Sequence, residues 1–456
     1  MRMRSLSRMA RLSAVPLGAA RRLAWAGGLR AFGRLTDESA LDLHERTADQ
    51  LVEVLGGLRG GVLKFGQVLS VYEAVMPPKV SAVYRGRLAA LQEAVRPEPA
   101  ETVERVMRGD VGADWRDLFA SFDTGVAAAA SLGQVHRARW AADGRDVAVK
   151  IQYPDARDEL LGDRDAVVFA MRMFTSLMAP RLDGRALAAE LMDRLAEELD
   201  YAREAAAQRA FRAAYLDDPD LLVPDVLLHE GRVIVSEWIG GTPLARVIEA
   251  GDQPERDRAG LLLTRLMFSA IARCGMMHGD PHPGNFRLLG DGRLGVLDFG
   301  AVYRHEPGAP TPLERWMDVH LAALDPGAGM ADALRRAGFL RPGVPADEAR
   351  LRELFLRSGA PAFTDTFRFD GAYLRDALEG ITASMPVGLS MAFPPGAVHA
   401  QRALGVGIGV LCQLEAEVPF QAEALRWLTK TRSVDSRSGP AAAAPDRPAA
   451  APPDAE

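Results

Sequence analysis

The sequence has very little cysteine and no long apolar run. Its two cysteines, Cys274 and Cys412, are too few for a disulfide framework, and no C-x-x-C or Cys/His cluster indicates a thiolate metal site. Both features predict a reduced, cytosolic compartment. The longest uncharged apolar stretches, such as residues 404–412, end well short of the roughly 20 residues that span a bilayer. No transmembrane helix is therefore expected.

The chain also lacks an excess of positive charge. Its formal net charge is −6, which argues against general nucleic-acid binding, because such binding needs a basic surface that releases counterions from phosphates. Apolar residues make up 48% and charged residues 25% of the chain, so a sizeable core can form. A length of 456 residues suggests two or three domains of about 150 residues.

Lysine and asparagine are scarce enough for the remaining ones to stand out. The basic residues are almost all arginine, and lysine occurs only at Lys64, Lys79, Lys150 and Lys430. Asn285 is the single asparagine of the sequence. The four lysines are therefore candidates for roles that arginine does not fill. Asn285 is a candidate for a role that requires asparagine.

Composition and periodicity divide the chain into five parts. The first 36 residues carry eight arginines and no acid, interleaved with apolar residues. They predict either a basic amphipathic helix with peripheral membrane contact or an N-terminal arm without that role. The parts expected are a basic arm (1–36), a helical extension (37–112), a small lobe (113–240), a large helical lobe (241–432) and a disordered tail rich in alanine and proline (433–456).

Local patterns predict the main strands of the small lobe and its helix. Strands over 134–140 and 146–153 flank an Ala-Asp-Gly-Arg turn, which is typical of a hairpin. A long helix is expected over 185–215 and another strand over 233–237. A second hairpin is expected where two apolar runs, 286–289 and 294–298, flank a Gly-Asp-Gly turn.

The segment from His278 to Asn285 and the Asp-Phe-Gly that begins at Asp298 carry the most specific pattern of the sequence. Asp280 can accept or orient the proton of an attacking hydroxyl. Asn285 and Asp298 offer oxygen ligands to Mg²⁺, a hard cation that binds few protein oxygens together with phosphates. Each piece alone is also a common turn or strand cap, but together they predict phosphoryl transfer.

Upstream, Val-Ala-Val-Lys is a strand that ends in Lys150, and such a lysine in a kinase-like fold pairs with the α- and β-phosphates of ATP. The helix after it offers Glu198, Asp200 and Glu204 as acidic partners. Glu198 and Glu204 are six residues apart, so on one helix they project about 120° apart and could serve two different cations. A solvated acidic helix face is the alternative interpretation.

The segment ahead of this strand is rich in alanine where a kinase has a glycine-rich loop. Alanine Cβ atoms restrict the close approach of the backbone to phosphates, so we expect ATP to sit in a pose that differs from that in an ordinary protein kinase. The residues expected to contact the nucleotide are Ala128, Ala129, Ala130, Ser131, Val149, Lys150 and Glu237.

Together these motifs resemble the UbiB (AarF-type) atypical kinase family. The alanine-rich loop, Val-Ala-Val-Lys, Glu-Leu-Asp-Tyr at 198–201 with Glu204, His-Gly-Asp-Pro-His-Pro-Gly-Asn and Asp-Phe-Gly are all present. The decisive addition is Lys-Phe-Gly-Gln at 64–67, because a Lys-x-Gly-Gln motif marks that family and is absent from ordinary kinases. The resemblance covers about residues 40 to 420.

The resemblance implies a bilobal protein-kinase-like α+β fold with an N-terminal helical extension, and ATP with Mg²⁺ as cofactors. Lys150 would pair with Glu204, while Lys64, on the same helix face as Gln67, would reach toward Glu198 and Asp200. The N-terminal helices would then occlude the groove for protein substrates. An ATPase or small-molecule kinase that supports isoprenoid-quinone or other lipid metabolism is expected.

Three departures from the family pattern qualify this expectation. Val126 stands where the family usually has proline, and Ala207 stands where an asparagine commonly occurs. Neither change removes a catalytic group. Some members carry C-terminal transmembrane helices, whereas this chain ends in an alanine- and proline-rich segment, so membrane contact would be peripheral.

Two other functions remain open at this stage. An aminoglycoside-phosphotransferase-like small-molecule kinase also shows a His-Gly-Asp loop and a similar aspartate, although Lys64 and the alanine segment argue against it. The other alternative is a nucleotide-gated lipid-binding scaffold without catalysis. The sequence names neither the phosphate acceptor nor the oligomeric state.

Overall fold

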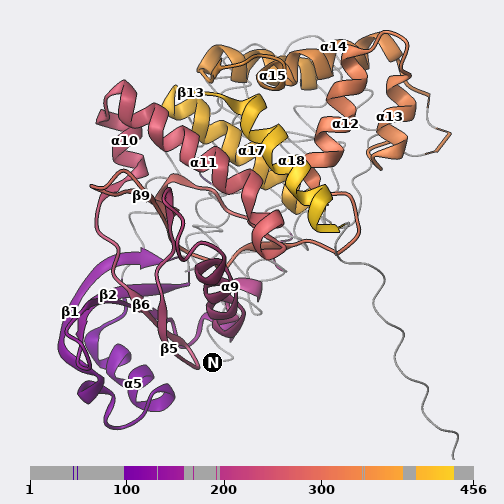
Figure 1. The fold of residues 1–456 in the computed structure, drawn as a ribbon. Helices are drawn as coiled ribbons and strands as arrows, with labels where there is room; N and C mark the ends of the chain where they lie inside the picture. Colours follow the sequence, from indigo (N-terminus) through magenta and orange to yellow (C-terminus); the bar gives the residue numbers. More distant parts are fainter. Residues whose placement is uncertain are drawn as a thin grey trace, which may run out of the picture.

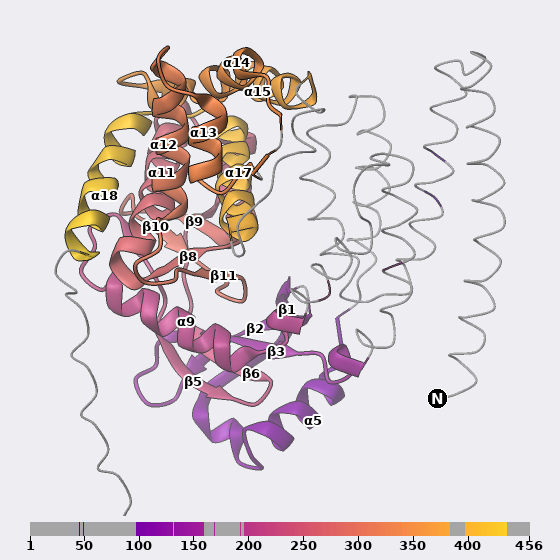
Figure 2. The same ribbon diagram turned by 90° about the vertical axis from the view of Figure 1, so that its right-hand side faces the viewer.

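The computed structural model describes residues 97–130, 132–158, 196–340, 342–343, 345–383 and 397–435, together with the single residues 45, 49, 168 and 192. The predicted basic arm, most of the helical extension, Lys64, Gln67 and Ser131 lie outside these residues. The described part has two lobes, a smaller one built on a β-sheet and a larger helical one (Figures 1 and 2). The α+β class expected from the sequence is observed.

The small lobe is built on a five-stranded sheet in the order β1-β2-β3-β6-β5, in which neighbouring strands are antiparallel. Its strands are β1 (Phe119–Ala130), β2 (Gly133–Trp140), β3 (Asp146–Gln152), β5 (Val226–Glu230) and β6 (Val233–Glu237). The predicted hairpin of β2 and β3 and the predicted strand β6 are confirmed.

One face of this sheet forms the core of the small lobe. Val147, Val149 and Ile151 alternate along β3 and are at most 2% exposed, as period-2 side-chain alternation requires. Helix α5 (Ala100–Asp110) and the short η1 (Trp115–Leu118) cover this face in the same apolar cluster. Asp110, at the end of α5, receives two hydrogen bonds from the guanidinium of Arg232 and so fixes the helix to the turn between β5 and β6.

Helix α9 (Tyr201–Ala214) lies against the other face of the sheet (Figure 2). Its residues Tyr201 and Ala205 pack on Val226 and Ile234 of the sheet. The prediction of one helix over 185–215 is wrong in this region. One helical segment ends before Leu199 and Asp200, and a new helix begins at Tyr201. Asp200 caps the new helix by accepting a hydrogen bond from the Arg203 backbone N–H.

Short strands at the junction of the lobes position the loops that contain Asp280, Asn285 and Asp298. A four-stranded sheet has the order β4-β10-β9-β7, and β8 pairs with β11. The strands are β4 (Leu221–Leu222), β7 (Thr242–Pro243), β8 (Met276–His278), β9 (Phe286–Leu288), β10 (Leu294–Val296) and β11 (Val302–Arg304). The predicted second hairpin is confirmed by the pairing of β9 with β10.

The larger lobe is helical, with α11 at its centre (Figure 1). An Asp252–Glu255 capping box starts α11, and Gly275 in the left-handed conformation ends it. The elements of this lobe are α10 (Leu244–Ala250), α11 (Gln253–Cys274), η2 (Pro283–Asn285), α12 (Pro312–Leu324), α13 (Met330–Arg336), α14 (Glu348–Ser358), η3 (Ala360–Ala362), β12 (Phe367–Arg368), α15 (Gly371–Ala383), α17 (Ala397–Leu414), β13 (Glu417–Val418) and α18 (Phe420–Asp435).

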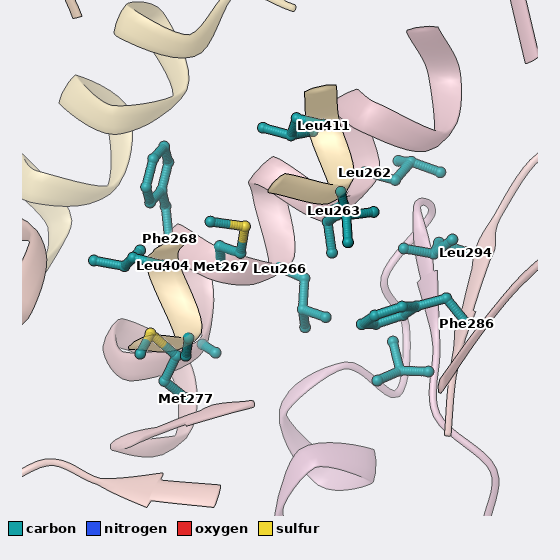
Figure 3. Packing of buried hydrophobic residues seen from close by; sticks show 14 of the residues in the cluster. Leu262, Leu263, Leu266, Met267, Phe268, Met277, Phe286, Leu294, Leu404 and Leu411 are labelled. Carbon is teal, nitrogen blue, oxygen red and sulfur yellow. The ribbon is translucent and has the colours of Figure 1, made fainter. Parts of the chain in front are cut away.

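The core of the larger lobe connects α11 to the β9–β10 hairpin. Figure 3 shows Phe286 and Leu294 of the hairpin beside Leu262 and Leu263 of α11, and they belong to one buried cluster. Leu411 of α17 joins the same cluster. Burial of these side chains fixes the hairpin rigidly, and with it the loops at both of its ends.

At the ends of two elements the structure differs from the prediction. The alanine stretch is not a free loop, because Ala128, Ala129 and Ala130 belong to β1 and pair with β2. The helix α18 continues to Asp435, slightly beyond the predicted start of the tail. Among the described residues, no helix combines the length and apolar character that crossing a membrane requires.

Candidate active site

Lys150 connects the two lobes through its side chain. Because Val149 and Ile151 face the core of the small lobe, Lys150 lies on the opposite face of β3. Its Nζ donates a 2.5 Å hydrogen bond to Glu204 Oε1 of α9 and lies 3.6 Å from Asp298 Oδ2. The ring centroid of Tyr201 lies 5.3 Å from the same ammonium. The predicted pairing of Lys150 with Glu204 is present in this geometry.

Burial and charge act together on this ion pair. Burial opposes the ammonium form of Lys150, but the carboxylates of Asp298 and Glu204 outweigh it and raise the lysine pKa well above its usual value. Burial is also the main reason why the pKa of Glu204 rises to about 7. The ammonium of Lys150 opposes that rise, and the Asp298 carboxylate adds to it. The lysine is therefore fully charged at neutral pH.

Three carboxylates converge around Gly300. A Cβ atom on this glycine would lie 3.3 Å from Asp298 Oδ1, 3.5 Å from Glu204 Oε2 and 3.7 Å from Glu198 Cγ. Glu198 and Glu204 therefore approach the same point from two separate helical segments, and the projection angle expected for one continuous helix does not apply. So much negative charge in a partly buried place stabilises any cation that enters it.

Asp298 has an unusual backbone conformation, which sets the direction of its side chain. Its φ is +58°, in the left-handed region that non-glycine residues rarely adopt. The carbonyl of Asp298 accepts a 2.7 Å hydrogen bond from His278 Nε2, and its Oδ1 accepts one from the Gly300 N–H. Phe299 is buried beside Phe211 of α9, with ring centroids 5.0 Å apart. The core thus holds the loop, while the carboxylate, 40% exposed, faces outward.

Asp280 and Asn285 are held in one loop after β8. The Asn285 side-chain N–H donates to the carbonyl of Asp280 at 2.9 Å, and the Leu297 N–H donates to the carbonyl of Asn285. Gly279 lies so close to the next segment that a Cβ there would be 2.9 Å from the carbonyl oxygen of Ala301. This close approach brings the Asp280 loop beside the Asp298 loop.

The donor set fits magnesium. The amide nitrogen of Asn285 is used by the Asp280 carbonyl, so the group left for a ligand is its amide oxygen. Asp298 adds an outward-facing carboxylate. Among the described residues no three His, Cys, Asp or Glu side chains form a metal cage. Two protein oxygens completed by phosphates are what Mg²⁺ commonly uses with nucleotides.

The hairpin of β1 and β2 is fixed next to its turn. A Cβ on Gly133 would lie 2.4 Å from the Ile151 carbonyl oxygen and 2.9 Å from the Tyr201 hydroxyl, so only glycine fits there. The Gln134 side chain accepts a hydrogen bond from the Glu98 N–H at 2.7 Å. This bond ties the start of α5 to the hairpin. Ala128 is exposed on the last part of β1.

The predicted nucleotide contacts Val149 and Glu237 lie in different surroundings. Val149 is fully buried in the small-lobe core, on the face opposite Lys150. The Glu237 carboxylate receives hydrogen bonds from Arg145 and from the Asp225 N–H. Asp200, predicted as a partner of Lys64 and not as a nucleotide contact, is exposed and caps α9.

Sequence reasoning missed three residues near Lys150. Ala148 and Lys150 lie on the same face of β3, and Ser236 pairs with Ala148 on the neighbouring strand. The alternation of side chains on β3 could have indicated Ala148. Tyr201 had no comparable signal, because its approach to Lys150 depends on how α9 packs.

Comparisons with known proteins agree with this geometry. The ABC1 atypical kinase-like domain matches residues 90–319. The chain is 32% identical over 281 residues to the mitochondrial atypical kinase COQ8 of Schizosaccharomyces pombe, covering 61% of this chain and 45% of that protein. It is 34% identical over 267 residues to the mitochondrial atypical kinase coq-8 of Caenorhabditis elegans, covering 57% of this chain and 34% of that protein. The chain thus spans less than half the length of these curated relatives.

A solved structure gives broader coverage. Rv3197 from Mycobacterium tuberculosis, determined in complex with erythromycin, is 38% identical, with a TM-score of 0.61, and the match covers 85% of this chain and 97% of that chain. Together with the domain match, it confirms the predicted kinase-like α+β fold.

Proposed function

This chain belongs to the ABC1 atypical kinase-like family, the UbiB type that its motifs predict, and we propose that it binds Mg-ATP and transfers or slowly hydrolyses the terminal phosphoryl group. The observation that carries this proposal is the ion pair of Lys150 with Glu204, 3.6 Å from Asp298. These groups come from the small sheet, from α9 and from the loop after β10. Their convergence holds the Lys150 ammonium between the lobes, where it would meet a polyphosphate together with bound magnesium.

Each side chain has a role in this proposal. Lys150, held by Glu204, binds the α- and β-phosphates. Asp280, 8% exposed, accepts the proton of an attacking hydroxyl or orients it. Asn285 and Asp298 would hold magnesium, which when bound would neutralise phosphate charge. Positioning and electrostatics, rather than covalent chemistry by the protein, carry most of such a reaction.

The phosphate acceptor that we propose is a small molecule or lipid in isoprenoid-quinone or other lipid metabolism. The proposal rests on the UbiB-type family motifs, including the Lys64 motif in the helical extension. Contact with a membrane would be peripheral, through the arginine-rich residues 1–36.

The deciding experiment measures Mg-dependent ATP binding and turnover for wild type and Asp280→Asn. Phosphate release is followed with and without anionic liposomes that contain quinone precursors. The proposal expects tight binding by both proteins and turnover by wild type that falls at least a hundredfold in the variant. Binding without any turnover would favour the nucleotide-gated scaffold, and no Mg-dependent binding at all would refute the proposal.

A second candidate ligand comes from the solved relative, which was determined with erythromycin. Macrolide binding by this chain is tested by thermal shift with erythromycin, with and without Mg-ATP. Stabilisation by erythromycin would support it, and competition with ATP would indicate that the two ligands overlap.

A further inference from the structure

Strand β9 places Arg287 on the face that points away from the core. Its neighbour Phe286 is fully buried in the large-lobe core, and Leu288 packs against the same cluster. Side chains alternate along a strand, so Arg287 lies on the other face. Arg287 pairs with Gly295 of β10, which lies between the buried Leu294 and Val296. Arg287 and Gly295 therefore share a face.

Residues 238–241, the connector between the two lobes, cross this face. A Cβ on Gly295 would lie 3.0 Å from Ile239 Cγ2, so the connector lies directly over the glycine. Gly241, further along the connector, has a φ of +91°, and a Cβ there would be 2.6 Å from the Leu288 carbonyl oxygen. The Gly241 carbonyl accepts a 3.2 Å hydrogen bond from Arg287 Nη1. The guanidinium is thus held at the connector.

The proposed magnesium ligands lie at the ends of these two strands. Asn285 is the last residue of η2, directly before β9, and so lies only two residues from Arg287 along the chain. Asp298 follows the end of β10, the strand paired with β9. A nucleotide that lies along β9, with its phosphates at Asn285 and Asp298, would have its base beside Arg287, between the phosphate site and Gly241.

We propose that the guanidinium of Arg287 is the surface on which the purine ring of the bound nucleotide stacks. The inference deepens the proposed function and rests on it. A guanidinium is planar, always charged and weakly hydrated, and it stacks on aromatic rings, whereas an ammonium presents a strongly hydrated point charge. The Gly241 carbonyl accepts a hydrogen bond from one edge of the group, and a hydrogen bond at the edge does not use the flat face on which a base would stack.

The test separates base from phosphate recognition. Calorimetry measures the dissociation constants of Mg-ATP and of Mg-tripolyphosphate, which has the charge but no base. The proteins are wild type, Arg287→Ala, Arg287→Lys and, as a matched control, Arg293→Ala, because Arg293 lies on the same hairpin and pairs with Asp291 at its exposed end. We expect Arg287→Ala to weaken Mg-ATP about tenfold, as the loss of one base stack does, and to leave tripolyphosphate unchanged. Arg287→Lys should not restore ATP affinity, and Arg293→Ala should match wild type.

The opposite results would refute this inference but not the proposed function. Equal weakening of both ligands, or full restoration by lysine, would make Arg287 a phosphate-attracting charge. Unchanged ATP affinity in Arg287→Ala would show that Arg287 does not contact the nucleotide. Unchanged tripolyphosphate affinity also shows that the variant is folded. Wild type that binds neither ligand would instead refute the proposed function.

Discussion

Lys150 and Asp298 form an ion pair between the two lobes, with Nζ 3.6 Å from Oδ2, although they lie 148 positions apart in the sequence. The lysine comes from β3 of the small sheet, and the aspartate follows β10 at the base of the larger lobe. The Lys150 side chain is 18% exposed and that of Asp298 40% exposed, so the pair lies where the buried interior meets solvent.

Asp298→Asn should abolish Mg-dependent ATP binding. The change removes the negative charge that magnesium needs, while the two side chains have nearly the same shape. Thermal shift with ATP, with and without Mg²⁺, measures the effect. Asp291→Asn is the control, since Asp291 lies at the exposed tip of the hairpin. Full stabilisation by Mg-ATP in the Asp298 variant would show that the metal assignment is wrong.

Lys64→Ala should change ATP affinity or turnover tenfold or more, about 1.4 kcal/mol. The reason is the carboxylate convergence of Glu198, Glu204 and Asp298 around Gly300, where a second cation is stabilised. A surface lysine would cost under about 0.5 kcal/mol and leave ATP handling unchanged.

The companion variants test the shape of the lysine site. Lys64→Arg should not restore activity, because a guanidinium fork does not fit a place shaped for an ammonium. Glu198→Gln should mimic Lys64→Ala in part, because it removes one partner. ATP affinity and hydrolysis are measured for all variants. Wild-type values in both lysine variants would contradict an inserted Lys64.

Ala128→Gly should alter nucleotide affinity or autophosphorylation. Ala128 lies on the last part of β1, where it pairs with Val135, and loss of its methyl group lets the backbone approach phosphates more closely. Ala141→Gly, in the exposed turn between β2 and β3, is the matched control. Binding and radiolabel incorporation are compared for the two variants. If they behave alike, the alanine segment is only a spacer.

Stability should fall as the pH is lowered from 7.5 to 5, partly through His320. Burial lowers the pKa of His320 from 6.5 to about 4. A histidine with a lowered pKa in the fold binds fewer protons there than when unfolded, so its contribution is present above pH 6.5 and is lost as the pH falls. The loss by pH 5 is about 2 kcal/mol.

Urea unfolding of wild type and His320→Phe at both pH values checks this contribution. The variant keeps an aromatic ring beside Trp316 and Phe355 but cannot titrate. Its stability should change less with pH than that of wild type. An equal change in both proteins would exclude His320 as a cause.

The sequence by itself determined the elements whose signals are local. The hairpin of β2 and β3 followed from alternation and a turn, and the group of Asp280, Asn285 and Asp298 followed from spacing around a second hairpin. In both cases strands that are neighbours in the sequence pair with each other. Few arrangements compete, because the connections are only a few residues long.

Only the tertiary structure decided which of these residues meet. The end of one helical segment at Leu199 and the start of α9 at Tyr201 bring Glu198 and Glu204 together at Gly300, where a continuous helix would have separated them. The approach of Tyr201 to Lys150, and of Arg287 to Gly241, depends on how α9 and the connector pack on distant strands. Local periodicity reports which side of an element is apolar, but the partner of a polar side chain is chosen by contacts between segments far apart in the chain.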